Sequence, residues 1–157
     1  MPELDADTYP ANYDLARCQP GDPTAPEETR TTRRLTITLC GSTSRAAHDL
    51  ARVHRALALA GHLVHAPVPP MQGEPPATTE QLQALTERHR AAIDASHLVI
   101  AVIPDGHTGV ATAAEMTYAE RYAPTTRWVT DVDALVGDPA AWLDGADTYP
   151  ALQPATA

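Results

Sequence analysis

The chain of 157 residues lacks two residue types entirely, because it contains no lysine and no phenylalanine. All 11 of its basic residues besides histidine are therefore arginines. The absence of lysine excludes a catalytic lysine and also the lysine of a Walker-type phosphate loop. Aromatic residues make up only 4% of the chain, so aliphatic side chains must form most of any core.

Cysteine is also scarce, with only Cys18 and Cys40 in the whole chain. Two cysteines this far apart form no disulfide framework and do not suggest a metal site. Cys40 ends a predicted core strand, which favours a buried thiol. We expect a reducing, cytoplasmic location.

The chain also lacks long apolar runs and a net positive charge. No stretch approaches the ~20 apolar residues that span a bilayer, and the segment Met1-Pro-Glu-Leu-Asp5 has neither the basic nor the apolar region of a secretory signal. The net charge of −9 repels polyanions and argues against a nucleic-acid surface. We expect no membrane or nucleic-acid partner, although a few N–H groups and one arginine can still hold a small anion.

The hydrophobic pattern divides the chain into three parts. Residues 1–34 have no sustained period and are rich in Pro, Asp, Glu, Thr and Arg, which predicts an irregular arm. Residues 35–130 form the predicted α/β core, and residues 131–157 form a tail with short helices around 132–136 and 139–143. The segment Ala-Asp-Thr-Tyr-Pro-Ala occurs at 6–11 and again at 146–151, and we have no physical account of it.

Within the core, strands alternate with helices. The predicted strands are 35–40, 63–66, 98–103 and 127–130, and the predicted helices are 45–60, 78–96 and 112–122. The second helix carries Leu82, Leu85, His89 and Ile93 along one stripe. Right-handed crossovers then build a single doubly wound parallel sheet, flavodoxin-like or Rossmann-like, with the order 2-1-3-4 and helices on both faces. The loops that follow the first and third strands should face one crevice.

The most informative segment runs from Ile103 to Ala119. Two glycines and small polar residues lead from a strand into a helix, with Glu115 in or near its first turn. The helix dipole favours an ionised carboxylate there, and the carboxyl end of a parallel strand is a usual place for a nucleophile. The alternative is that Glu115 only improves the helix start.

The loop Gly41-Ser-Thr-Ser-Arg45 is the second candidate. Gly41 permits close backbone approach, Ser42 and Thr43 offer hydroxyls, and Arg45 offers a fork of donors at a helix start. These features fit a phosphate cradle. The alternative is a Ser/Thr helix cap with Arg45 in solvent.

Together these two loops, with Arg88-His-Arg-Ala-Ala-Ile-Asp-Ala-Ser-His97, resemble the nucleoside 2-deoxyribosyltransferases and related nucleotide N-glycosidases over roughly residues 35–130. The resemblance implies that Glu115 attacks the anomeric carbon and that His89 contacts the base. It also implies that the 5′ end of the sugar or a phosphate is held by loop residues, among them Gly41, Ser42, Thr43, Arg45, Gly109 and Thr112. Subunits of this family commonly associate, so we expect a homodimer or a larger homo-oligomer.

Breaking an N-glycosidic bond passes through an oxocarbenium-like state that a carboxylate stabilises and can trap as an ester. Either His89 or Asp94 could protonate or hydrogen-bond the departing base, and no metal or organic cofactor is required. Both residues also have structural interpretations, His89 at the core edge and Asp94 at a helix end. Tyr118 either orients Glu115 or only packs.

Two other functions compete with the glycosidase. One is a non-catalytic nucleotide-binding or sensing module that uses the same crevice. The other is a phosphoribohydrolase of the lysine-decarboxylase-like group, which expects a denser Gly-Gly-x-Gly-Thr run than this chain has.

Overall fold

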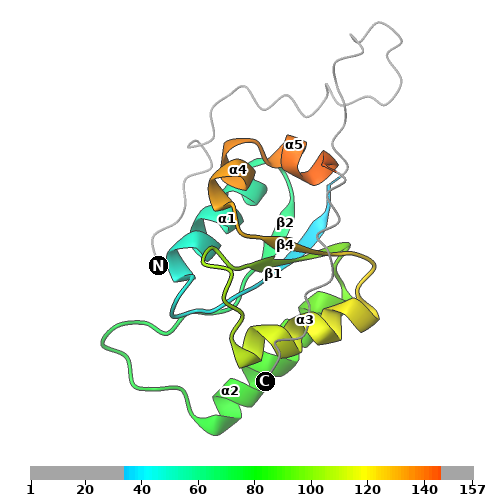
Figure 1. Ribbon diagram of the computed structural model, residues 1–157. Helices are drawn as coiled ribbons and strands as arrows, with labels where there is room; N and C mark the ends of the chain where they lie inside the picture. The colour runs from blue at the N-terminus through cyan, green and yellow to red at the C-terminus, as the bar shows by residue number, and fades with distance from the viewer. Residues whose placement is uncertain (1–33, 146–157) are drawn as a thin grey trace, which may run out of the picture. The chain divides into compact units, whose positions relative to one another are not determined.

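The computed structural model describes residues 34–145 (Figure 1). Nearly all of the predicted N-terminal arm and both copies of Ala-Asp-Thr-Tyr-Pro-Ala lie outside the described residues. The proposed division of the chain at residues 34/35 and 130/131 stays a prediction.

The described residues contain a four-stranded parallel sheet with the order β2-β1-β3-β4, which confirms the predicted topology. The strands are β1 (Thr36–Cys40), β2 (Leu63–His65), β3 (Leu98–Val102) and β4 (Thr126–Val129). The two central strands, β1 and β3, are almost wholly buried, as the near-continuous apolar sequence of β3 predicts for a strand covered on both faces.

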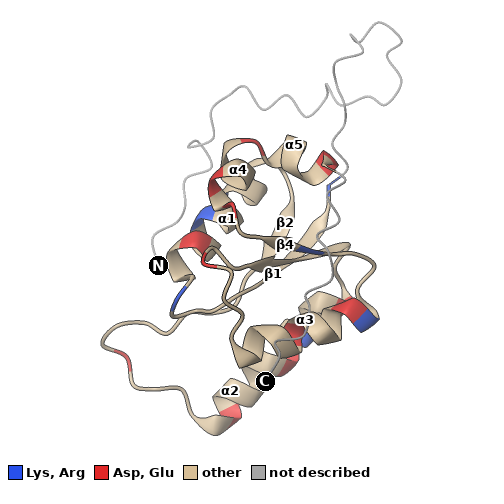
Figure 2. Ribbon diagram, in the orientation of Figure 1, with Lys and Arg blue, Asp and Glu red and all other residues tan. Residues whose placement is uncertain are grey.

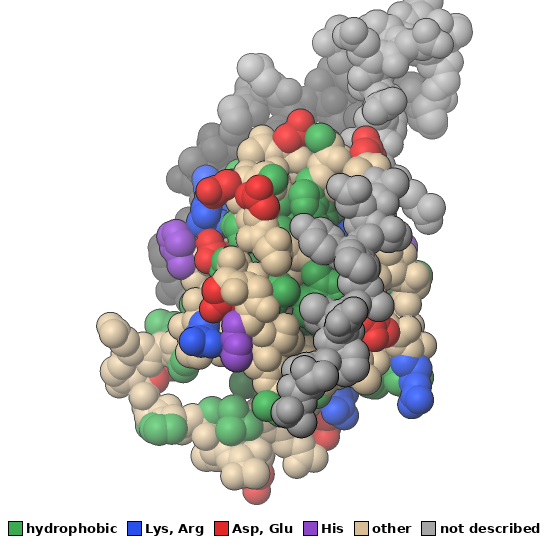
Figure 3. Space-filling view, viewed as in Figure 1, with side chains coloured by type: hydrophobic (Ala, Val, Ile, Leu, Met, Phe, Trp, Pro, Cys, Tyr) green, Lys and Arg blue, Asp and Glu red, His purple; other side chains and the backbone are tan. Residues whose placement is uncertain are grey.

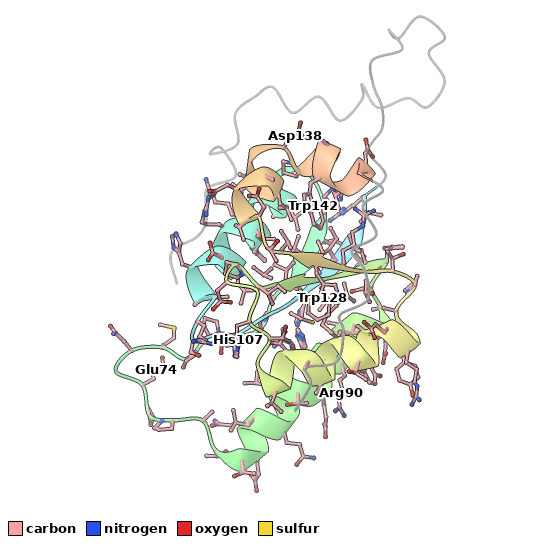
Figure 4. All side chains as sticks on the ribbon, in the orientation of Figure 1. Glu74, Arg90, His107, Trp128, Asp138 and Trp142 are labelled. Carbon is pink, nitrogen blue, oxygen red and sulfur yellow. The ribbon has the colours of Figure 1, made fainter. Side chains whose placement is uncertain are left out.

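Helices cover both faces of this sheet, so the doubly wound architecture is confirmed (Figure 1). The helices are α1 (Ala47–Leu59), α2 (Thr79–Asp94), α3 (Val110–Tyr122), α4 (Val132–Gly137) and α5 (Pro139–Asp144). One face is covered by α1 and α4, and the other by α2 and α3. Figure 4 shows the same division in the two tryptophans, because Trp128 belongs to the α2/α3 face and Trp142 packs on the opposite one.

Alternation along β1 explains why its side chains serve two different cores. Ile37 and Leu39 point to the face of α1 and α4, where they join Val53, Leu57 and Leu135. Cys40 points to the face of α2 and α3, where the cluster contains Ile93, Val99, Ala101, Met116 and Ala119. The last residue of β1 therefore lies directly under the two helices that carry His89 and Glu115.

The predicted apolar stripe of α2 packs on the sheet only along its second half. His89 and Ile93 are buried, whereas Leu82 is 54% exposed and Leu85 is half-buried. The helix begins after an exposed loop, and its first turn is fixed by a reciprocal capping box between Thr78 and Gln81 rather than by burial. The first half of α2 therefore projects away from the sheet (Figure 1).

No helix within residues 34–145 has both the length and the apolar character needed to cross a membrane. Figure 2 marks acidic residues on all five helices, and arginines on α1, α2, α3 and β4.

Gly41, directly after β1, packs against the end of β3 and gives the first testable prediction. A Cβ atom at Gly41 would lie 2.9 Å from the Val102 carbonyl oxygen and 3.2 Å from Leu50 Cδ2. We expect Gly41→Ala to lower the free energy of unfolding by about 1–3 kcal/mol in urea denaturation, because the strand exits must separate.

Gly137→Ala is the matched control, since a Cβ there meets nothing within 4 Å and the residue lies in a helix. It should be neutral or slightly stabilising. Equal loss of stability in both variants would contradict the close packing at Gly41.

Candidate functional site

Three side chains from three separate elements meet at the carboxyl end of β1. Cys40 Sγ lies 3.4 Å from His89 Nε2 of α2, and that nitrogen lies 3.7 Å from Glu115 Oε2 of α3. Cys40 is fully buried and His89 is nearly so, whereas the Glu115 side chain keeps 28% of its surface exposed. The site therefore has a closed interior side and one open side at Glu115.

A pocket of about 300 Å³ adjoins these residues on the open side. Its walls are Val64 to Val68, at the end of β2 and in the following loop, and the α2 residues Leu82, Leu85, Thr86, Arg88 and His89, with Glu115 contributed by α3. Figure 3 shows the loop and the start of α2 standing away from the body around an opening. Glu115 is the only carboxylate among the residues that line the pocket.

Burial sets the protonation states at the site. It raises the pKa of Glu115, and a hydrogen bond from the Cys40 thiol offsets part of this rise. Burial, with a smaller contribution from His65, lowers the pKa of His89 from 6.5 to about 4. Burial also raises the pKa of the Cys40 thiol. At neutral pH the thiol is therefore protonated and the imidazole is neutral.

The position of Glu115 corrects the expectation drawn from the sequence. Helix α3 starts at Val110, with Gly109 as its N-cap, and it has no acidic residue in its first turn. Glu115 is the sixth helical residue, in the second turn, beyond the reach of most of the dipole effect. Its environment is set by burial against Cys40 and His89, and its pKa is raised rather than held low.

The predicted phosphate-binding loop lies apart from the pocket walls. Ser42 Oγ accepts a hydrogen bond from the Arg45 backbone N–H at 3.1 Å and lies 3.2 Å from Ser44 Oγ. The N-cap of α1 is Ala46, without a side-chain hydrogen bond, so the interpretation of this run as a Ser/Thr helix cap is wrong. Thr43 is half-buried, and Arg45 is exposed.

The exits of β1 and β3 do lie side by side, as expected. Gly41 packs against the Val102 carbonyl oxygen. In the loop after β3, the pKa of Asp105 is held below its ordinary value, first by a hydrogen bond from the His107 N–H and also by the charge of Arg45. Figure 4 labels His107 in this loop. Both α1 and α3 thus begin at this edge without side-chain caps, which leaves their first N–H groups available to an anion.

Asp94, a predicted contact of the base, and Tyr118, a candidate to orient Glu115, are hydrogen-bonded to each other. The Tyr118 hydroxyl donates a hydrogen bond to Asp94 Oδ1 at 2.8 Å, and this contact joins α3 to α2. Tyr118 also lies 5.4 Å from the Arg90 guanidinium and 4.5 Å from the Tyr122 ring. Asp94 is exposed and does not line the pocket, and the Tyr118 hydroxyl bonds to Asp94 rather than to Glu115.

The remaining predicted residues lie either at the pocket or at the edge where α1 and α3 begin. Thr112 is buried in the first turn of α3, next to Gly109, on the side of the uncapped helix starts. His89 and Glu115 are the two predicted residues that the fold brings together in the pocket. The sequence reasoning missed three others at the site, namely Cys40, His65 and Arg88.

The ligand atoms of Cys40, His89 and Glu115 all lie within 4.8 Å of one another, so these residues could hold a metal ion. No metal was expected from the sequence, because its two cysteines are too few and too far apart and the proposed chemistry requires none. Strand alternation at Cys40 was the one available signal, since it places the thiol on the face opposite Ile37 and Leu39.

Comparison of the chain with protein-family models, with curated proteins and with solved structures finds no match. The family resemblance drawn from the motifs therefore stays a prediction, and the argument for function depends on the geometry of the pocket.

The lowered pKa of His89 predicts a pH-dependent loss of stability. Between pH 6.5 and about 4 the unfolded chain binds a proton at this imidazole and the folded chain does not, so stability is full above this range and declines as the pH falls through it. We expect the unfolding free energy of the unaltered chain to fall relative to that of His89→Gln over this interval. Urea unfolding with a chelator present measures both, and parallel pH curves would contradict the prediction.

Proposed function

We propose that the protein cleaves or transfers the N-glycosidic bond of a nucleoside or nucleoside 5′-monophosphate, with Glu115 as the nucleophile. The observation that carries the proposal is the half-buried Glu115 carboxylate, which lines a pocket beside the neutral His89 imidazole. Glu115 and His89 lie at the carboxyl end of β1, the edge of the sheet at which parallel α/β folds usually bind their ligands.

The charge distribution of the pocket supports the nucleophilic route. Cleavage builds positive charge on the sugar, and a single desolvated carboxylate stabilises that charge more strongly than a hydrated one. Glu115 is the only carboxylate among the described lining residues, and an inverting reaction would need a second one to activate water. A glycosyl ester on Glu115 follows, which water resolves to a free sugar or a second base resolves to a new nucleoside.

The departing base needs a hydrogen bond or a proton. His89 is neutral at pH 7 and is therefore a poor proton donor. We assign it a hydrogen-bonding role toward a ring nitrogen or carbonyl of the base. The apolar walls formed by Val68, Leu82 and Leu85 offer surface on which the flat base can pack.

The distance between the two parts of the site suits a nucleotide rather than a free base. Glu115 lies six residues after Gly109, roughly 9 Å along α3. A sugar at Glu115 can thus extend its 5′ end toward the uncapped starts of α1 and α3, near Ser42 and Arg45. We also propose that the protein forms a homo-oligomer, in which a neighbouring subunit covers the open side of the pocket.

The decisive variant is Glu115→Gln, which keeps the size of the side chain and removes its charge. We expect base release to fall by roughly 10³-fold or more, within the range of losses seen when a catalytic nucleophile is removed. Glu120→Gln is the matched control on the same helix, because Glu120 is exposed. Thermal unfolding of both variants should match the unaltered chain.

Incubation with mixed nucleosides and 5′-monophosphates, with and without a free base, followed by chromatography, measures the activity. Free sugar identifies a hydrolase and a new nucleoside identifies a transferase. Unchanged turnover in Glu115→Gln would exclude the role of this residue. Tight calorimetric binding without turnover would replace the enzyme with a nucleotide-binding module.

A further inference from the structure

We propose that Cys40, His89 and Glu115 form a three-ligand site for a thiophilic divalent metal ion such as Zn²⁺, with its fourth coordination position facing the pocket. The three ligand atoms come from the end of β1, the buried half of α2 and the second turn of α3. They lie within 4.8 Å of one another.

The distance between His89 and Glu115 favours two ligands around an ion over a direct hydrogen bond. The 3.7 Å from His89 Nε2 to Glu115 Oε2 exceeds the 2.7–3.2 Å range of a good hydrogen bond. Tetrahedral Zn²⁺, with bonds of about 2.3 Å to sulfur and about 2.0–2.1 Å to nitrogen or oxygen, places its ligand atoms about 3.3–3.6 Å apart. The 3.4 Å from Cys40 Sγ to His89 Nε2 lies inside that range, and the 3.7 Å from His89 Nε2 to Glu115 Oε2 lies just above it. The thiol and the carboxylate lie within 4.8 Å of each other.

The surroundings of His89 also favour coordination. The side chain is buried, with 6% of its surface exposed, and its Nδ1 atom has no hydrogen-bond partner among the described residues. With the proton on Nδ1, the lone pair of Nε2 is directed to the space between Cys40 and Glu115. No other side chain in the described part of the chain hydrogen-bonds to Nε2 besides Cys40.

The chemistry of the three donors selects the ion. A thiolate and an imidazole suit Zn²⁺, whereas Mg²⁺ and Ca²⁺ prefer oxygen ligands alone. On binding, the Cys40 thiol loses its proton to solvent and the sulfur forms the metal bond. His89 and Glu115 both line the pocket, so the open position of a tetrahedral ion is accessible from it.

The consequence for activity rests on the proposed function. A Glu115 oxygen bound to the ion is no longer free to attack a sugar, and the ion itself repels the positive charge that develops there. Metal binding and glycosyl transfer at this corner are therefore mutually exclusive, and Zn²⁺ inhibits the enzyme.

The test is a titration of the full chain with Co²⁺, Zn²⁺ and Mg²⁺. The protein is first stripped of metal by a chelator, and the chelator is then removed. We expect about one equivalent of Co²⁺ to bind with the near-ultraviolet absorption of a thiolate–cobalt bond, Zn²⁺ to displace it, and Mg²⁺ to have no effect. Cys40→Ala should abolish the absorption band. Glu115→Gln should weaken binding by roughly 10-fold or more while the band is retained.

Cys18→Ala is the control for the second thiol of the chain and should bind like the unaltered protein. Loss of the band in Cys18→Ala, an unchanged band in Cys40→Ala, or no binding of Co²⁺ to the unaltered chain would overturn the proposal. If Cys40→Ala fails to fold, equal Co²⁺ affinity in Glu115→Gln and the unaltered chain overturns it as well. If Cys40, His89 and Glu115 bind metal but the protein releases no base, the proposed function alone is contradicted. If the protein releases base and Zn²⁺ does not inhibit it, the metal site is contradicted.

Discussion

The parallel pairing of β1 with β3 is the constraint on which the rest of the site depends. It aligns Cys40 with Ala101 at the centre of the sheet, and it brings the loops that follow both strands to one edge. The crossovers then place α2 and α3 over the same face, so His89 and Glu115 converge above Cys40. Gly41 follows the paired residues of β1, at a position where no side chain fits against the Val102 carbonyl oxygen.

The sequence predicted the sheet order and the position of every strand and long helix to within about two residues, because buried runs and helical spacing are local signals. It placed Glu115 too near the helix start, since the first residue of α3 is decided by Gly109 in its loop. It gave no sign that Leu82 is exposed, because an apolar stripe does not reveal how far a helix extends beyond its sheet. The contact of Cys40 with His89 joins segments 49 residues apart, and no spacing rule reports such a contact.

The projecting half of α2 explains why a pocket exists at all. A helix packed along its whole length would bring Leu82 and Leu85 onto the sheet and close the space beside Glu115. Leaving these side chains partly exposed sacrifices hydrophobic stabilisation, and the Thr78–Gln81 capping box offsets some of that loss by fixing the first turn. Leu82 and Val68 both remain exposed apolar side chains, and both line the pocket.

One electrostatic feature underlies both proposals for this corner. Burial disfavours the ionised forms of Cys40 and Glu115 and the protonated form of His89, so His89 supplies no cation beside Glu115. A sugar that develops positive charge in its transition state supplies that cation transiently, and a bound metal ion supplies it permanently. Both partners need the same Glu115 oxygens, so the features that would make this carboxylate effective toward an oxocarbenium ion also make it a ligand for Zn²⁺. The thiol of Cys40 separates the two roles, because a thiolate strengthens metal binding, whereas the protonated thiol can only donate a hydrogen bond to Glu115.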